Sequence, residues 1–197
     1  MSKVRIVAAA VLLCAGAWFA PAFADEYRDF YQLYKSGDPA QALERIEAYL
    51  AQKPHDSRTR FLKGVILAEQ LRRTEAIAVF TELTQDFPEL SEPYNNLAVL
   101  YAAQGDYPRA RETLEMAVRT NPGYATAYEN LGDVYAMLAS QAYDKAVKLD
   151  RNNGSAPRKL EITRELFTIK APATEAAAGA PPPIAPKTSK PGLRRFQ

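Results

Sequence analysis

The 197-residue chain has little of what catalytic and metal sites are usually built from. It contains one histidine, His55, and one cysteine, Cys14, whereas a structural zinc site takes about four His or Cys ligands. Carboxylate pairs such as Glu129 and Asp133 fall far short of the roughly six to eight oxygen ligands that calcium takes. There is no glycine-rich phosphate loop, and the sequence places no nucleophile near His55. We therefore expect no metal, no cofactor and no catalytic residues, and a protein that is not an enzyme.

The N-terminus, residues 1–24, has the features of a signal peptide. Lys3 and Arg5 precede an apolar run from Ile6 to Ala20, and Ala22-Phe23-Ala24 is a small-x-small cleavage motif. The apolar run is shorter than the roughly 18 residues expected of a membrane span, which favours cleavage after Ala24 over a retained anchor. We therefore expect a periplasmic or secreted protein with no stable membrane insertion after cleavage.

The charge of the cleaved chain argues against a nucleic-acid partner. The whole chain has 25 basic and 23 acidic residues, and removal of Lys3 and Arg5 would bring these numbers into balance. A nucleic-acid or anionic-membrane surface would show as a clustered excess of Lys and Arg, which this balance does not indicate.

An internal repeat is the strongest pattern in the sequence. Pro54, Pro88 and Pro122 lie 34 residues apart, and with proline taken as position 32, the later copies begin at Ser57, Ser91 and Ala125. The third copy has the clearest pattern: Tyr94, Leu97, Ala98, Tyr101, Gly105, Asp106, Ala110, Leu114 and Ala117. The earlier copies keep part of it: Leu33, Gly37, Asp38, Ala42 and Ile46 in the first, and Gly64, Leu67, Ala76 and Phe80 in the second.

This spacing predicts a helical hairpin in each copy. Apolar residues at positions 4, 7, 8 and 11 share one face of a first helix, and those at 20, 24 and 27 line a second helix. Asp38 and Asp106 follow glycine in the predicted turns and are expected to cap the second helices. The second copy lacks that glycine, and Thr74 is the expected cap there. It also carries Arg60 and Lys63 at positions 4 and 7, where an aromatic residue and a leucine stand in the third copy.

The pattern resembles the tetratricopeptide repeat (TPR) family over roughly Glu26 to Asn153. The resemblance implies an all-α solenoid of antiparallel helix pairs, with repeats at 25–56, 57–90 and 91–124. The segments Tyr128–Tyr135 and Ser140–Ala146 also resemble the repeat region of exported proteobacterial proteins, some of which are linked with cell-wall transpeptidases.

The end of the array departs from the repeat. A shortened fourth copy, 125–153, lacks the five residues of the hairpin turn, which predicts one long helix; a tight turn near Ala139-Ser140 is the alternative. A capping helix is expected over 155–170, with four side chains facing inward: Leu160, Thr163, Leu166 and Phe167. Residues 171–197 are rich in Ala and Pro and are expected to be disordered.

The resemblance also implies a binding groove lined by the first helices. The residues at its groove positions are Tyr27, Tyr31, Tyr34, Arg58, Phe61, Val65, Asn95, Asn96, Val99, Glu129, Asn130 and Asp133. The alternative for Tyr27, Tyr31 and Phe61 is packing against the array's own helices. The chaperone-tail clamp of the family has Lys and Asn where this chain has Tyr27 and Tyr31, which argues against a terminal carboxylate as the ligand.

We therefore expect a non-enzymatic periplasmic adaptor that binds a protein or peptide in this groove, with cell-envelope assembly as the setting that the resemblance suggests. Two alternatives stay open: an accessory subunit of a cell-wall-acting enzyme, and a structural protein that self-associates as a homo-oligomer.

Overall fold

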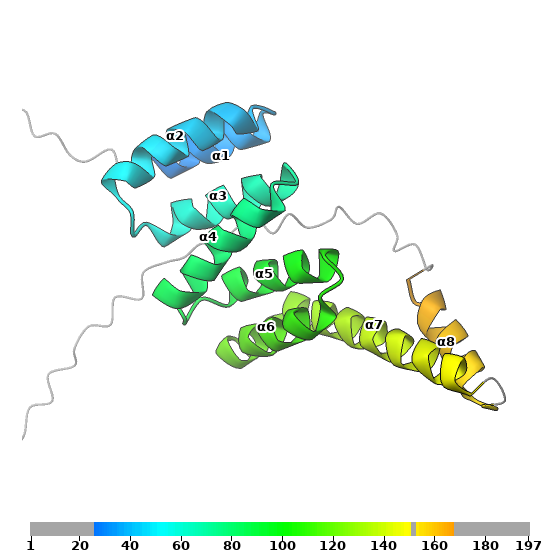
Figure 1. Ribbon diagram of the computed structural model, residues 1–197. Helices are drawn as coiled ribbons and strands as arrows, with labels where there is room; N and C mark the ends of the chain where they lie inside the picture. Colours follow the sequence, from blue (N-terminus) through cyan, green and yellow to red (C-terminus); the bar gives the residue numbers. More distant parts are fainter. Residues whose placement is uncertain (1–25, 151–152, 168–197) are drawn as a thin grey trace, which may run out of the picture.

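The computed structural model describes residues 26–150 and 153–167, and this part of the chain is all-helical (Figure 1). Its helices are α1 (Glu26–Lys35), α2 (Pro39–Gln52), α3 (Ser57–Glu69), α4 (Arg73–Asp86), α5 (Ser91–Ala103), α6 (Tyr107–Thr120), α7 (Ala125–Leu149) and α8 (Ala156–Glu165). The predicted signal peptide and the predicted Ala/Pro-rich tail lie outside the described residues.

The helices form a solenoid, as the repeat predicts. The pairs α1–α2, α3–α4 and α5–α6 are hairpins, and each second helix also packs against the first helix of the next pair. Two apolar clusters run through the stack, one centred on Phe80 and Leu67 and the other on Leu114 and Ala98.

Two of the three hairpin turns use the predicted glycine and aspartate. Gly37 and Gly105 have φ of 90° and 78°, a left-handed conformation that glycine adopts without a steric penalty. Asp38 then accepts a hydrogen bond from the backbone N–H of Gln41 at 3.0 Å, and Asp106 accepts one from Arg109 at 3.1 Å. Both predicted caps are confirmed.

The turn of the second hairpin differs from the prediction. The residue before α4 is Arg72 and no side chain caps this helix, so Thr74 lies in the first turn and the prediction of a Thr74 cap is wrong. The Arg72 guanidinium instead pairs with Glu75, at 2.7 and 2.6 Å. Leu71 occupies the glycine position with a φ of 59°, so a leucine is held in the left-handed region.

We expect Leu71→Gly to raise the free energy of unfolding by about 1 kcal/mol, because it removes the steric cost of a left-handed leucine. Leu71 is exposed, so the change sacrifices little packing. The control is Gln70→Gly at the neighbouring residue, where φ is −74° and glycine only adds freedom to the unfolded chain. Urea unfolding followed by circular dichroism measures both, and a loss of stability in Leu71→Gly would contradict the expectation.

Ion pairs explain the polar residues in the second copy. Arg60 is buried in the position of the usual aromatic, and its guanidinium reaches Asp86 at 2.5 Å and Glu82 at 3.2 Å. Lys63 reaches Glu47 of α2 at 3.0 Å. The methylene stem of Arg60 can therefore fill apolar space while its charge meets carboxylates at the rim.

The fourth copy forms one continuous helix, α7, of 25 residues. The prediction of a long helix is confirmed, and a tight turn near Ala139-Ser140 is not formed. In Figure 1 the C-terminal half of α7 projects from the stack, with α8 packed beside it.

The predicted inward face of the capping helix is correct only in part. Leu160 is buried and Thr163 is half-buried, but Leu166 and Phe167 are exposed. The helix ends at Glu165, and among the described helices α8 contacts α7 alone. Side chains beyond the first two turns of α8 therefore have too little surface to pack against. Residues 168–170 of the predicted helix are not among those described.

Candidate functional site

The first helices of successive hairpins form one continuous face. α1 contacts α3, α3 contacts α5, and α5 contacts α7, whereas within the described part of the chain no contact joins α2 to α4 or α4 to α6. The stack is therefore closer on the side of the first helices and curves toward them. We call this side the inner face; it carries the predicted groove positions.

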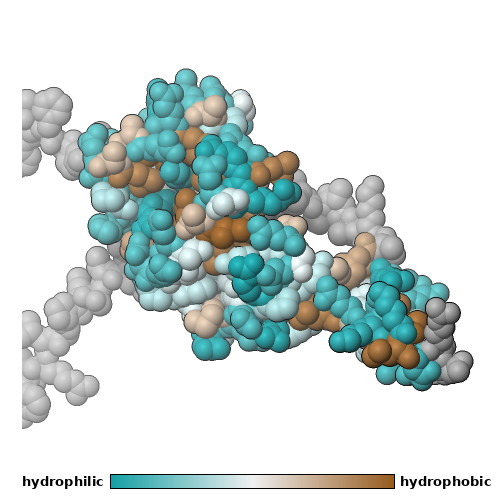
Figure 2. All heavy atoms as spheres, viewed as in Figure 1, coloured by the Kyte–Doolittle hydropathy of each residue, from teal (hydrophilic) through white to brown (hydrophobic). Residues whose placement is uncertain are grey.

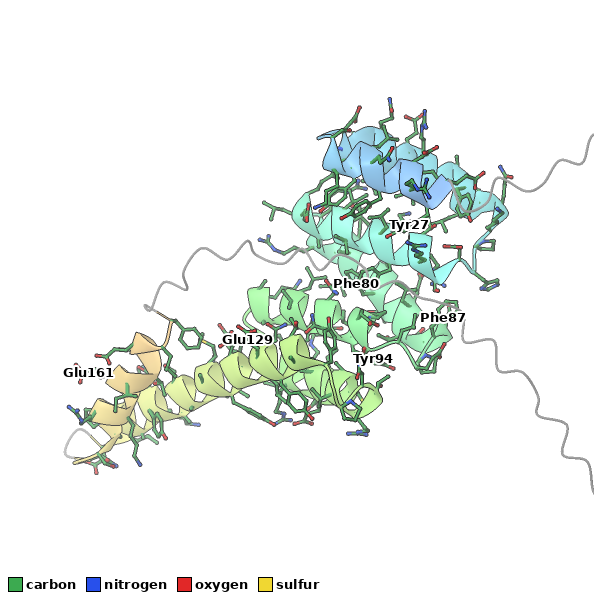
Figure 3. All side chains as sticks on the ribbon, turned by 180° about the vertical axis from the view of Figure 1, so that it is seen from behind. Tyr27, Phe80, Phe87, Tyr94, Glu129 and Glu161 are labelled. Carbon is green, nitrogen blue, oxygen red and sulfur yellow. The ribbon has the colours of Figure 1, made fainter. Side chains whose placement is uncertain are left out.

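An aromatic cluster lies at the N-terminal end of the inner face. It consists of Tyr27, which is labelled in Figure 3, together with Tyr31, Tyr34 and Arg58. The rings of Tyr27 and Tyr31 are stacked with centroids 6.4 Å apart, and Tyr34 meets Tyr31 edge-on at 6.0 Å. The Arg58 guanidinium of α3 lies 3.7 Å from the centre of the Tyr27 ring, a cation–π contact. Three predicted site residues of α1 are thus joined to one of α3.

The cluster combines apolar surface with polar groups. Its three tyrosines are half-buried, and the Tyr34 hydroxyl donates a hydrogen bond to the Glu69 carboxylate of α3. Burial raises the pKa of Tyr27, and burial together with the Glu69 carboxylate raises the pKa of Tyr34. Both hydroxyls therefore stay protonated at neutral pH and keep their capacity to donate hydrogen bonds.

Phe61 is part of the core and does not line an open groove. Its side chain is only 8% exposed and meets the Phe80 ring edge-on, with centroids 5.6 Å apart. Val65, one turn further along α3, is half-buried against the same cluster. For Phe61 the structure agrees with the alternative of packing within the array, because its ring lies against Phe80 of α4.

An amide cluster, Asn95 and Asn130, lies further along the inner face. The Asn130 side-chain N–H donates to the side-chain oxygen of Asn95 at 2.8 Å, which joins α5 to α7. Asn96 donates instead to the backbone carbonyl of Glu92 at 2.9 Å, while Val99 is exposed. Asn95 is buried, at 6% exposed, and Asn130 is half-buried, so the bond leaves the side-chain oxygen of Asn130 as the more accessible amide group of the pair.

The C-terminal end of the inner face is acidic. Glu129 and Asp133 are exposed one turn apart on α7, and Glu129 is labelled in Figure 3. Partial burial and, secondarily, the Glu129 charge raise the pKa of Asp133. The predicted site residues therefore follow one another in the expected order, from aromatic and basic to amide and acidic.

Two sequence profiles described as tetratricopeptide repeat match the chain, one over residues 30–90 and the other over 67–133. Together they cover more than half of the chain. The protein belongs to the tetratricopeptide repeat family.

Relatives of this TPR protein include chloroplast and fungal proteins. The TPR domain-containing protein PYG7 of Arabidopsis thaliana is 38% identical over 80 residues, which are 38% of this chain and 27% of PYG7. The heat-shock protein cognate co-chaperone sgt12 of Aspergillus fumigatus is 28% identical over 159 residues, 75% of this chain and 46% of sgt12. The chain therefore spans less than half the length of these curated relatives.

Solved TPR structures share the fold. YrrB, described as a TPR protein with an unusual peptide-binding site, has a TM-score of 0.50 and 26% identity, covering 53% of this chain and 54% of YrrB. A thermophilic TPR protein from Thermus thermophilus has a TM-score of 0.55 and 22% identity, covering 74% of this chain and 83% of that chain. The second likeness is one of fold alone.

The TPR stack also has a pocket away from the inner face, which the repeat pattern did not indicate. It has a volume of about 330 Å³ and lies between the first two hairpins, lined by residues from α2, α3 and α4 together with the exposed His55. Arg60 and Lys63 line it, and their charge at positions that are usually apolar was the one sequence signal for this pocket.

Within the described ranges, no group of three or more His, Cys, Asp or Glu side chains could hold a metal ion. None of the helices described here is long and apolar enough to cross a membrane.

Proposed function

We propose that the protein is a non-enzymatic adaptor that holds an extended segment of a partner protein along its inner face. TPR folds are typically interaction scaffolds without catalytic groups, and YrrB, which has this fold, is described as having a peptide-binding site. The observation that carries the proposal is the presence of the aromatic cluster and the amide cluster on one face.

The two clusters offer complementary contacts to an extended peptide. Half-buried tyrosine rings can cover apolar side chains of the partner, each worth roughly 1.5–3 kcal/mol when fully buried. The amide acceptor left on the half-buried Asn130 can pair with a peptide backbone N–H, while the buried Asn95 holds the Asn130 side chain in place. The acidic end, Glu129 and Asp133, favours a basic residue at that end of the partner segment.

We further propose that the protein works in the periplasm, in cell-envelope assembly. Support comes from the leader of residues 1–24, with its basic start, apolar run and small-x-small motif. N-terminal sequencing of the protein isolated from the periplasmic fraction tests this. Asp25 as the first residue would support export, and an intact Met1 in the cytoplasmic fraction would contradict it.

The binding proposal predicts that Tyr31→Ala lowers the affinity for the partner segment at least about tenfold, because it removes the central ring of the aromatic cluster. The partner segment is first captured from envelope extract, and its affinity is then measured by calorimetry. Tyr31→Phe is the matched control, since it keeps the ring and is expected to bind within about twofold of the wild type.

Circular dichroism of both variants separates loss of binding from loss of fold. Equal affinity of Tyr31→Ala and the wild type, with both folded, would reject the inner face as the binding site. Turnover of a cell-wall substrate by the purified protein would reject the non-enzymatic part of the proposal.

A further inference from the structure

Among the described helices, none packs against the first half of α7 as the second helix of each hairpin packs against its first helix. At repeat position 8, a Cβ added to Gly64 would lie 2.7 Å from the Phe80 ring of its second helix, and Ala98 is fully buried. A Cβ added to Gly132, the equivalent residue of α7, would meet nothing within 4 Å among the described residues. The seam that a second helix fills in the other repeats is open in the fourth.

The tyrosines of this seam are correspondingly exposed. Tyr128 is 50% exposed, whereas Tyr94, at the same position of the third repeat, is 9% exposed. Tyr135 is 48% exposed, although its hydroxyl donates to Glu115 of α6 at 3.2 Å. We call Tyr128, Gly132 and Tyr135 the open seam.

The chain does contain a second-helix sequence for the fourth repeat. Ala139, Tyr143 and Ala146 have the spacing of Ala76, Phe80 and Leu83, which are the positions that fill the seam of the second repeat. This segment forms the second half of α7, directly continuous with the first half. Each residue of an α helix advances about 1.5 Å, so Ala139 lies about 10 Å along the axis from Gly132 and cannot fold back onto it.

We propose that two copies of the protein exchange these halves and form a symmetric domain-swapped dimer. The second half of α7, with its attached α8, lies in the open seam of the other copy, and the reverse exchange fills the second seam. The contact of Gly64 with Phe80 then has its equivalent in Gly132 of one copy against Tyr143 of the other. The two-fold axis passes beside Met137 and Leu138, where the missing hairpin turn would stand.

The charges of α7 suit this antiparallel pairing. Its first half carries Glu129 and Asp133 and no basic residue, whereas its second half carries Lys145 and Lys148 beside one acidic residue, Asp144, with which Lys148 pairs at 2.5 Å. Antiparallel exchange places the basic half along the acidic half in both seams. Partial burial raises the pKa of Asp133 in the single chain, and a lysine placed beside it by the exchange would lower that pKa.

The exposed apolar side chains of α8 also favour the exchange between two copies. Ile162, Leu166 and Phe167 are exposed, and Figure 2 shows apolar side chains gathered on the projecting α7–α8 hairpin. In the stack each first helix contacts the next, as α5 contacts α7. After the exchange, α8 lies beside the first half of the other copy's α7, as the first helix of a following repeat would. Its apolar side chains are then buried against that helix.

Restoring the missing turn tests the exchange. The variant inserts Gly-Asp-Tyr-Pro-Arg, the turn of residues 105–109, between Leu138 and Ala139, so that each chain can fill its own seam. Light scattering with size exclusion is expected to give twice the mass of one chain for the wild type and the mass of one chain for the insertion variant. A wild type that stays monomeric at about 100 µM, or an insertion variant that stays dimeric, would overturn the proposal.

A pair of substitutions at one residue tests the seam itself. Gly132→Leu places a large side chain at the crossing and is expected to raise the dimer dissociation constant at least about tenfold. Gly132→Ala is the smaller step, because the third repeat accepts Ala98 at this position, and it is expected to raise the dissociation constant several-fold less than Gly132→Leu does. In a single chain a Cβ at residue 132 meets no described neighbour, so both variants are expected to fold, which circular dichroism checks. Equal dissociation constants for the two variants would place the dimer contact elsewhere and reject the seam.

Discussion

Phe80→Ala is expected to lower the free energy of unfolding by about 3–5 kcal/mol, the range for removing a fully buried phenylalanine. The Phe80 side chain is 0% exposed, meets Phe61 edge-on at 5.6 Å, and lies over Gly64 of α3. The cavity left by the ring is bounded by packed helices on both sides and cannot collapse without moving α3. Urea unfolding followed by circular dichroism measures the change.

Phe87→Ala is the matched control, because Phe87 is half-buried at the end of α4. We expect it to cost about 1–2 kcal/mol, since its ring is already in part in contact with water. If the two variants lost equal stability, Phe80 would not be the centre of the N-terminal core.

Gly64→Leu is expected to destabilise the protein by about 3 kcal/mol through overpacking. Even the first atom of the new side chain would lie 2.7 and 2.8 Å from Phe80 ring atoms, and this ring is fully buried and also packs edge-on against Phe61. Gly132→Ala provides the contrast at the same repeat position. Its methyl group meets no described neighbour in a single chain, so the better helix propensity of alanine should stabilise that helix by about 0.5–1 kcal/mol.

The double variant Gly64→Leu/Phe80→Ala tests whether the two losses share one cause. The leucine side chain can enter the space vacated by the ring, so the double variant should recover at least about 1 kcal/mol relative to the sum of the single losses. Additive losses would mean that Gly64 and Phe80 are not in direct contact. The result bears on function too, because α3 carries Arg58 of the inner face.

Most of the hairpin architecture could be predicted from local sequence. The glycines before Asp38 and Asp106 permit a left-handed turn, and the aspartates cap the next helix, so each turn is specified by adjacent residues. The absence of any turn residue in the second half of the fourth copy likewise led to the prediction of α7. These features depend on backbone conformation and on hydrogen bonds within a few residues.

The predictions that differ from the structure, and the alternatives between which it decides, concern single side chains, and their causes are the local backbone in one case and packing between helices in the others. Thr74 is not a cap because Leu71 adopts the left-handed conformation and α4 begins earlier. Phe61 has a groove position but is buried, because its ring packs edge-on against Phe80 of the neighbouring helix α4. Leu166 and Phe167 are exposed because α8 has only one neighbour among the described helices.

By itself, the sequence determined the repeat period, the all-helical class, the turns and the long fourth helix, since each follows from short-range periodicity and backbone preference. Only the tertiary structure decided which residues of the inner face are accessible, that Arg60 is paired with Asp86 and Glu82, and that the seam at Gly132 is open. The physical reason is that accessibility and ion pairing depend on which helices lie alongside, and repeats with the same spacing can have different neighbours.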